Sequence, residues 1–337
     1  MCSIDGQRYG RGDTKTEFCV QSCSKPITYC IALEENGIDK VHQHVSREPS
    51  GRSFNEIVLD TRREPNVPHN PLINAGAIMS CALVQPTRTV QERLAHCLNY
   101  WGRLGGGATP RMDEDTYKSE SATAWRNRCL TYVWNNAEWG VAVLPYLQCA
   151  LLKHPIYPHI VVLTPCRTIF SSPLLSSRLL SHLPRYMMKE RGAFPDDGSD
   201  ILETLEFYMM CCSIMQDAEG MSVIAATMAN GGVCPLTGDQ VFDPTHVQNA
   251  LSLMGTCGMY DYSGEFAFTM GFPCKSGVAG ALLIVIPNVM GMCTWSPRLD
   301  GNGNSVSFFF FLSSCLPVFL SSCLPFLLSS CLPFFFP

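Results

Sequence analysis

Residues 21–26 read Gln-Ser-Cys-Ser-Lys-Pro, and an apolar run from Ile27 to Leu33 follows them. A helix that begins near Ser22 brings Ser22 and Lys25 to one face, because positions i and i+3 of a helix are neighbours. Pro26 is tolerated there, since the first N–H groups of a helix have no intrahelical partner. The stretch therefore predicts a helix that begins with a paired serine and lysine.

The Ser22–Lys25 pair has the composition of a nucleophile and its base. A serine hydroxyl is a weak nucleophile that needs a neighbouring base, and a lysine amine is a usable base only if burial or positive charge lowers its pKa. Ser-x-x-Lys at a helix start supplies both groups in known serine acyl enzymes. The alternative interpretation is a helix-capping serine beside a solvated lysine.

The composition limits the class of protein. The chain has 337 residues, 46% of them hydrophobic, and a formal net charge of −5, so it can bury a large core and shows no basic field for nucleic acid. Its 18 cysteines include no Cys-x-x-Cys pair, and most lie in apolar runs. We expect buried thiols in a reducing compartment. The N-terminal residues have the pattern of neither a signal peptide nor a transit peptide.

The periodicity of the chain predicts an α+β fold, with an antiparallel sheet packed with helices. The expected helices are at 22–37, 74–80, 89–103, 119–127, 199–216, 223–229 and 247–257, and the expected strands are at 265–270, 278–287 and 289–295. A glycine-rich loop is expected at 104–118, and Gly37 is expected to end the first helix.

Two segments differ in kind from the rest. Residues 132–185 are rich in proline and keep no periodicity for long, and residues 307–337 repeat Leu-Ser-Ser-Cys-Leu-Pro every eight residues. Hydropathy marks the tail as a membrane span, but a proline in every repeat suits a spanning helix poorly. We hypothesise that both segments are translated noncoding sequence. The expected organisation is a catalytic domain in two parts, 1–131 and 186–306, with an atypical insertion and an apolar tail.

Two further local features accompany the Ser22–Lys25 pair. Tyr260 lies in a turn flanked by glycines, and Lys275-Ser276-Gly277 begins a predicted strand just after it. Ser-x-x-Lys, then a polar turn, then Lys-Ser/Thr-Gly on a strand is the order found in the penicillin-recognising serine enzymes. In those enzymes the strand backbone and the N–H of the nucleophile form the oxyanion hole.

Longer blocks of sequence narrow the resemblance to one family. They are Gln-Ser-Cys-Ser-Lys-Pro (21–26), Glu-Pro-Ser-Gly (48–51), Pro-His-Asn-Pro-Leu-Ile-Asn-Ala-Gly-Ala-Ile (68–78), Ala-Asn-Gly-Gly (229–232), Cys-Gly-Met-Tyr-Asp-Tyr-Ser-Gly (257–264), Lys-Ser-Gly-Val-Ala-Gly (275–280) and Pro-Asn-Val-Met-Gly-Met (287–292). In this order they closely resemble the animal kidney/liver-type glutaminases. The resemblance covers about residues 1–131 and 186–306.

The resemblance implies a β-lactamase/transpeptidase-like fold and the hydrolysis of L-glutamine to L-glutamate and ammonia. It implies that Ser22 is the acyl-forming nucleophile, Lys25 its base and Tyr260 a residue that assists proton transfer. The residues that match glutamine-binding positions are Ser22, Asn74, Glu120, Asn127, Tyr208, Tyr260 and Val278. Val278 would act through its backbone N–H, beside that of Ser22 in the oxyanion hole. The resemblance implies no metal or organic cofactor, a homotetramer and a mitochondrial location.

The matched side chains suit a free amino acid. A carboxylate such as Glu120 pairs with the α-ammonium group, and Asn74, Asn127 and Tyr208 offer amide or hydroxyl donors to the α-carboxylate. Each also has a structural alternative. Asn74 could cap a helix, Glu120 could be a solvated first-turn acid, Tyr208 could lie in the core, and Tyr260 could be a turn residue.

The chain also departs from the family pattern. In the family, another glutamine-binding tyrosine precedes the segment that matches residues 5–8, and this chain starts after that point. The atypical insertion falls between Asn127 and Tyr208, and the family's C-terminal ankyrin-type region and mitochondrial presequence have no match here. Two alternatives to a glutaminase therefore stay open: an inactive or mis-spliced glutaminase fragment, and another serine acyl hydrolase of the β-lactamase/penicillin-binding type.

Overall fold

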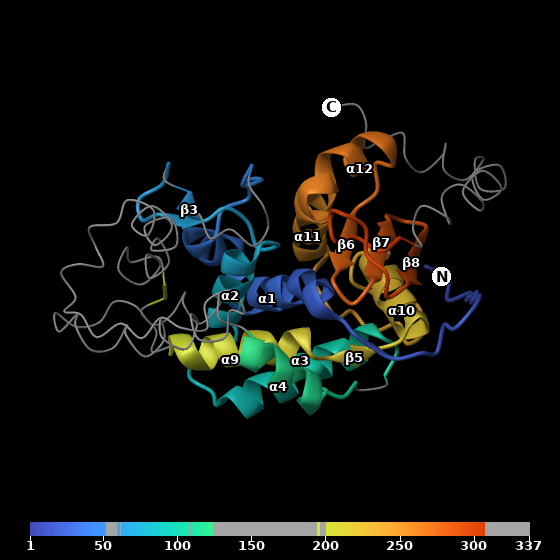
Figure 1. Cartoon of the computed structure of the whole chain (residues 1–337), viewed down its shortest axis with the longest axis horizontal. Helices are drawn as coiled ribbons and strands as arrows, with labels where there is room; N and C mark the ends of the chain where they lie inside the picture. The colour runs from blue at the N-terminus through green and yellow to red at the C-terminus, as the bar shows by residue number, and fades with distance from the viewer. Residues whose placement is uncertain (52–58, 61, 108–109, 124–193, 196–199, 307–337) are drawn as a thin grey trace, which may run out of the picture.

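An antiparallel sheet joins the two ends of the described chain (Figure 1). The computed structural model describes residues 1–51, 59–60, 62–107, 110–123, 194–195 and 200–306. The sheet has four strands, β1 (Cys2–Ser3), β6 (Cys274–Gly277), β7 (Ala281–Ile286) and β8 (Met290–Trp295), in the order β1-β8-β7-β6. Lys275 pairs with Leu283 across β6 and β7, which fixes the register of the strand that faces the site.

The central strand β7 is buried on both faces. Its sequence, Ala-Leu-Leu-Ile-Val-Ile, sends Ala281, Leu283 and Val285 into the main core and the alternate residues into a second cluster with Met259 and Phe266. Successive side chains of a strand point to opposite faces, so a strand covered on both sides reads as a continuous apolar run.

Helices cover the sheet and extend the core away from it. They are α1 (Ser24–His44), α2 (Asn74–Ala82), α3 (Val90–Leu104), α4 (Glu114–Thr123), α9 (Ile201–Cys212), α10 (Ala218–Ala229), α11 (Pro244–Cys257) and α12 (Ser263–Thr269). Helix α10 packs on β7 and β8, and a Cβ at Gly291 would lie 2.0 Å from the Ala226 nitrogen, so this close approach needs glycine. The α2, α3, α4 and α9 group packs against itself beside α1 (Figure 1).

Short elements complete the architecture. Two 3₁₀ turns, η1 (Gln21–Cys23) and η3 (Tyr260–Tyr262), precede α1 and α12. Two small pairs of strands, β2 (Phe18–Cys19) with β5 (Met215–Gln216) and β3 (Leu59–Asp60) with β4 (Val67–Pro68), are antiparallel. The starts of α3, α9, α10 and α11 are each capped by the side chain before the helix, from Thr89, Asp200, Asp217 and Asp243.

The α+β prediction is confirmed, and so are the helices expected at 74–80, 89–103, 199–216 and 247–257, within a few residues at their ends. The helix expected at 223–229 begins earlier, at Ala218, because Asp217 caps it. Gly37 interrupts the first helix where the sequence predicted its end, because its φ of 75° is not helical. A second helical stretch follows this kink and continues to His44, so α1 comprises two helical parts.

Three local expectations were wrong. Residues 265–270 are not a strand. Helix α12 spans Ser263–Thr269, and Gly271, two residues beyond its end, has a φ of 71° that suits the residue after a helix. Val278 lies outside both strands, because Gly280 closes a tight turn with its N–H bonded to the Gly277 carbonyl at 2.9 Å. The loop expected at 104–118 gives way to α4 from Glu114.

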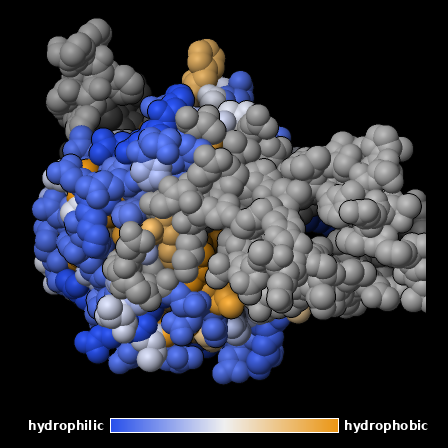
Figure 2. All heavy atoms as spheres, turned by 90° about the vertical axis from the view of Figure 1, so that its left-hand side faces the viewer, coloured by the Kyte–Doolittle hydropathy of each residue, from blue (hydrophilic) through white to orange (hydrophobic). Residues whose placement is uncertain are grey.

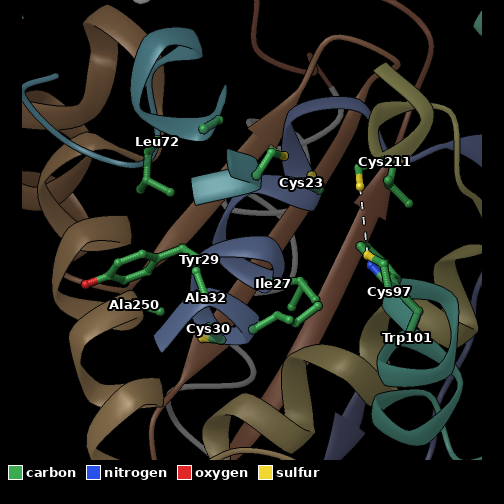
Figure 3. Close-up of a cluster of buried hydrophobic side chains, with 14 of the residues drawn as sticks. Cys23, Ile27, Tyr29, Cys30, Ala32, Leu72, Cys97, Trp101, Cys211 and Ala250 are labelled. Carbon is green, nitrogen blue, oxygen red and sulfur yellow. Dashed lines mark hydrogen bonds between the residues drawn. The ribbon is translucent and has the colours of Figure 1, made fainter. Parts of the chain in front are cut away.

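The cysteines of the described chain are thiols, and most are buried in the core as expected (Figure 3). Cys211 of α9 lies with its sulfur 3.9 Å from that of Cys97 on α3, in the contact that joins these helices. Figure 2 shows that the described surface on one face is largely hydrophilic, with hydrophobic residues gathered toward its middle. Among the described residues, no helix is both long and apolar enough to cross a membrane.

Asn127, the segment 132–185 and the tail 307–337 lie outside the described residues. The expectations for them stay predictions.

Candidate active site

Ser22 lies in the turn that leads into α1. It belongs to η1, and α1 itself begins at Ser24, two residues later than the Ser22 start expected from the sequence. Gln21, just before it, adopts φ 48°, a left-handed conformation that turns the chain sharply into η1. The Ser24 hydroxyl donates to the Gln21 carbonyl at 2.8 Å and closes this turn. Ser22 is 9% exposed, so its hydroxyl is at the border between core and solvent.

Lys25 is buried beside Ser22, at 1% exposure. Its Nζ donates to Asn74 Oδ1 at 2.7 Å and to the Leu72 carbonyl at 3.3 Å, both on the segment that enters α2. Burial, followed by the positive charge of Lys275, lowers the pKa of Lys25 to about 7. An amine with this pKa is neutral often enough near pH 7 to accept a proton, and this excludes the solvated-lysine alternative.

Asn74 links Lys25 to Tyr208. Its Oδ1 accepts from Lys25 and, at 3.3 Å, from the Tyr208 hydroxyl on α9. A Cβ on Gly76 would lie 1.8 Å from the Asn70 carbonyl, so the glycine lets the segment before α2 fold back onto the helix. Because both donors occupy Oδ1, the Asn74 amide NH₂ is the group that can donate to a ligand.

Tyr260 reaches the site from the opposite side. It has φ 54°, its hydroxyl donates to the Ser276 carbonyl of β6 at 2.9 Å, and it is 8% exposed. Burial raises the pKa of Tyr260, and a hydrogen bond with the Ser22 side chain acts against the rise. The Tyr260 phenol thus lies next to the Ser22 hydroxyl.

The turn around Ser22 packs directly on β6. A Cβ at Gly277 would lie 2.9 Å from the Val20 carbonyl and 3.2 Å from Cys23 Sγ. The Cys23 thiol is 3.3 Å from the Lys275 carbonyl, to which it donates. Val278 follows in the exposed turn, at 41% exposure. Close approach of η1 to the end of β6 is what an oxyanion hole built from the two backbones requires.

Glu120 lies on α4, next to the residue that precedes Ser22. The Gln21 side-chain amide donates to Glu120 Oε1 at 3.2 Å. The half-buried carboxylate is therefore close to the serine. The structure thus places seven of the eight predicted site residues around η1 and the elements packed on it. Lys25, Asn74 and Tyr208 form one hydrogen-bonded network, and Tyr260 is hydrogen-bonded to Ser22. Glu120 binds the neighbouring Gln21, and Val278 directly follows β6. Asn127 is the eighth.

Two contributors were missed by sequence reasoning. Lys275 is the first, and its signal is Lys-Ser-Gly at the start of a strand. Gln21 is the second, and no local signal marks its contact with Glu120, which is distant in sequence.

The family model, the relatives and the solved structures reported below are all described as glutaminases. The family model described as Glutaminase matches residues 1–140 and 177–316. Putative glutaminase 2 of Caenorhabditis elegans is 38% identical over 305 residues, and the mitochondrial liver isoform of glutaminase from Rattus norvegicus is 37% identical over 305 residues. Each alignment covers 90% of this chain and 41% of the relative, so the chain spans about two fifths of the length of these curated relatives.

Bacterial relatives and solved structures extend the comparison. A glutaminase of Nostoc is 33% identical over 306 residues, which cover 91% of this chain and 73% of the relative. The crystal structure of a Bacillus glutaminase in 4.3 M NaCl superposes with a TM-score of 0.70 and 28% identity, over 92% of this chain and 86% of that one.

Proposed function

The chain belongs to the glutaminase family, and from this premise we propose that it hydrolyses L-glutamine to L-glutamate and ammonia through a serine acyl-enzyme. It has the α+β, β-lactamase-like fold of the solved glutaminases. The observation that supports the activity most strongly is the buried Lys25 amine, whose pKa is lowered to about 7 three residues after Ser22. The proposed activity is that of the whole protein, and this chain spans about two fifths of the length of its curated animal relatives.

The proposed reaction begins at the side-chain amide carbon of glutamine. The Ser22 oxygen bonds to that carbon while Lys25 accepts the hydroxyl proton, and backbone N–H groups of Ser22 and Val278 stabilise the developing oxyanion. The carbon–nitrogen bond then breaks, and the nitrogen leaves as ammonia with a proton delivered through Tyr260. Water next attacks the glutamyl ester, which releases glutamate and restores the Ser22 hydroxyl.

The substrate's α-amino acid group explains the remaining side chains. Glu120 would accept hydrogen bonds from the α-ammonium group. The Asn74 amide NH₂ would donate to the α-carboxylate, with Asn127 as a further donor, and Tyr208 would donate there once its hydroxyl turns away from Asn74 Oδ1. A peptide or β-lactam carries no free α-ammonium and α-carboxylate pair next to its reacting amide. This set of groups therefore favours glutamine over the substrates of other serine acyl hydrolases of the same fold.

We further propose a kidney/liver-type glutaminase that works in mitochondria as a homo-oligomer, a homotetramer by resemblance. The support is the identity to the animal relatives, 38% and 37%, against 33% to the Nostoc glutaminase. One of these animal relatives carries a mitochondrial description.

The test is ammonia release from L-glutamine by the purified chain and by Ser22→Ala. Ser24→Ala is the matched control, because Ser24 is also a buried serine of the same turn but its hydroxyl donates to the Gln21 carbonyl. We expect ammonia from the parent chain and from Ser24→Ala, a loss of at least about 10³-fold in Ser22→Ala, and no hydrolysis of the β-lactam nitrocefin. Equal ammonia release by Ser22→Ala, or nitrocefin turnover without ammonia, would contradict the proposal.

A further inference from the structure

Lys275 is a second fully buried lysine of the site, and the proposed reaction leaves it without a role. A buried ammonium group costs free energy unless it is paired or hydrogen-bonded. Lys275 forms no ion pair with a carboxylate of the described residues, so its neighbours show what compensates its burial.

The Lys275 ammonium group is held by two carbonyls and one aromatic ring. Its Nζ donates to the Ser276 carbonyl at 2.7 Å and to the Gly258 carbonyl at 3.3 Å. It also lies 4.6 Å from the centroid of the Tyr260 ring, within the range of a cation–π interaction. Lys275 therefore contacts both the backbone that carries Tyr260 and the ring itself.

The same carbonyls also hold Tyr260 against β6. The Ser276 carbonyl that accepts from Lys275 also accepts from the Tyr260 hydroxyl at 2.9 Å, and the Gly258 carbonyl also accepts from the Ser276 N–H at 3.0 Å. Tyr260 has φ 54°, a left-handed conformation that is unfavourable for a non-glycine residue. Lys275 contacts the Tyr260 ring and the Gly258 and Ser276 carbonyls, and together these contacts keep Tyr260 in one conformation.

We infer that Lys275 is a positioning residue, which fixes the phenol of Tyr260 at Ser22 and supplies a second positive charge near Lys25. This inference rests on the proposed glutaminase function, because it assigns Lys275 to the same reaction. Lys275 itself need not touch the substrate.

The charge of Lys275 has a defined effect on Lys25. The titratable groups that face Lys25 are Lys275 on β6, Cys23 on η1, Cys81 on α2 and Cys212 on α9. Burial raises the pKa of Cys23 and of Cys212 to about 11, so these two thiols are neutral near pH 7. Burial lowers the pKa of Lys275 to about 8, so it is mostly charged there. Of these groups, Lys275 supplies the charge that disfavours protonated Lys25.

Lys25 acts as a base only when neutral, so kcat/KM for glutamine rises with pH through the pKa of Lys25 and then levels off. Lys275→Met removes the repelling charge and raises that pKa. We expect the acid limb of the profile to move about one unit toward higher pH and kcat at neutral pH to fall about tenfold, while KM changes little.

Three variants separate positioning from a loss of structure. Lys40→Met, at the exposed end of α1, is the matched control and keeps the parent profile. Lys275→Arg keeps the charge, so its acid limb stays near the parent value. In a Tyr260→Phe background, Lys275→Met lowers kcat by a smaller factor than in the parent chain. The reason is that the Ser276 carbonyl has already lost its hydrogen bond from the Tyr260 hydroxyl. Folding is checked by thermal unfolding, and the Gly258 and Ser276 carbonyls each keep their other donor in Lys275→Met.

A readout without turnover separates this inference from the proposed function. In the chain labelled with ¹³C at lysine Cε, the Lys25 resonance, assigned with Lys25→Met, reports its protonation by NMR. A higher Lys25 titration midpoint in Lys275→Met supports the inference even if the parent chain releases no ammonia, which would count against the proposed function alone. An unchanged midpoint in a folded Lys275→Met overturns the inference, even if the parent chain is an active glutaminase.

Discussion

Glu120 places a carboxylate beside the residue that precedes the proposed nucleophile. Its contact with the Gln21 amide fixes the carboxylate near Ser22, from a different helix. A carboxylate that pairs with the substrate's α-ammonium contributes to binding before and during the reaction, so its loss weakens substrate binding more than the chemical step.

Glu120→Gln tests this assignment. The amide keeps the size of the side chain but loses the charge, and a hydrogen bond to a charged group is worth about 1.5–3 kcal/mol. We therefore expect KM for glutamine to rise by roughly 10- to 100-fold, with a smaller change in kcat, in steady-state ammonia assays. Glu114→Gln is the matched control on the same helix, since Glu114 is exposed and pairs only with Lys118 among the described residues. Equal KM values for Glu120→Gln and the parent chain would refute the ammonium-binding role.

At the scale of single residues, the sequence was sufficient to pair Ser22 with Lys25 and to add Tyr260, because the first two are local neighbours and all three lie in recognisable motifs. It was insufficient to show that the pKa of Lys25 is lowered, and by which groups. The lowered pKa depends on burial and on Lys275, which reaches Lys25 only through the packing of η1 on β6. The contact between Gln21 and Glu120 depends on the same kind of long-range packing.

At the scale of elements, the approach of η1 to β6 depends on one missing side chain. Gly277 faces the Val20 carbonyl and Cys23 Sγ at distances that a Cβ would make too short. The two backbones proposed to form the oxyanion hole can therefore approach this closely only because residue 277 has no Cβ.

Gly277→Ala should separate these backbones. The added methyl group forces η1 or β6 to shift, which costs about 1–3 kcal/mol of unfolding free energy and lowers kcat by at least tenfold or so, because misplaced oxyanion donors lose transition-state stabilisation. Denaturant unfolding and ammonia assays measure both effects. Gly255→Ala is the control, since a Cβ there meets no atom within 4 Å, and in the helix α11 it should stabilise by about 0.5–1 kcal/mol. Full activity of Gly277→Ala would show that the close approach is not needed.

The elements that were predicted wrongly share a physical cause. Residues 265–270 alternate in polarity like a strand, yet they form α12, which buries Phe266 and leaves Phe268 90% exposed. Alternation over so few residues fits a short helix equally well, and the Gly271-Phe272-Pro273 helix stop was the better signal. At Gly37 the predicted break is present, and what the sequence did not predict is the second helical stretch that follows it to His44.

For the molecule as a whole, the fold class was predictable because most helical segments of this chain are long enough for their periodicity to be distinguished from that of a strand. The sheet order was not, since β1 is only two residues long and pairs with β8 at the other end of the sequence. The division into a catalytic domain of 1–131 and 186–306, with 132–185 and 307–337 outside it, stays a proposal, because residues 132–185 and 307–337 lie outside the described part of the chain.

The flanks of the proposed insertion contact each other directly. Helices α4 and α9 pack together, and the Tyr117 hydroxyl donates to Glu206 Oε1 at 3.1 Å. The Asp113 N–H also donates to the Ser213 carbonyl at 2.9 Å. These contacts between described residues join the two parts of the proposed domain, so we expect that the connection between α4 and α9 can be shortened without separating the helices.

A chain lacking 132–185 and 307–337 should therefore fold and keep the proposed activity. The deletion shortens the connection between α4 and α9 by roughly two thirds, and a smaller loop-closure entropy stabilises the fold by about 1 kcal/mol, or roughly 2–4 °C in Tm. Calorimetry and Ser22-dependent ammonia release measure the two outcomes, and a chain lacking only 307–337 separates the tail from the insertion. Loss of cooperative unfolding on removal of 132–185 would mean that the insertion is part of the core. Retained folding with lost ammonia release would mean that residues 132–185 contribute to the substrate pocket, because the contacts between α4 and α9 would then be intact without them.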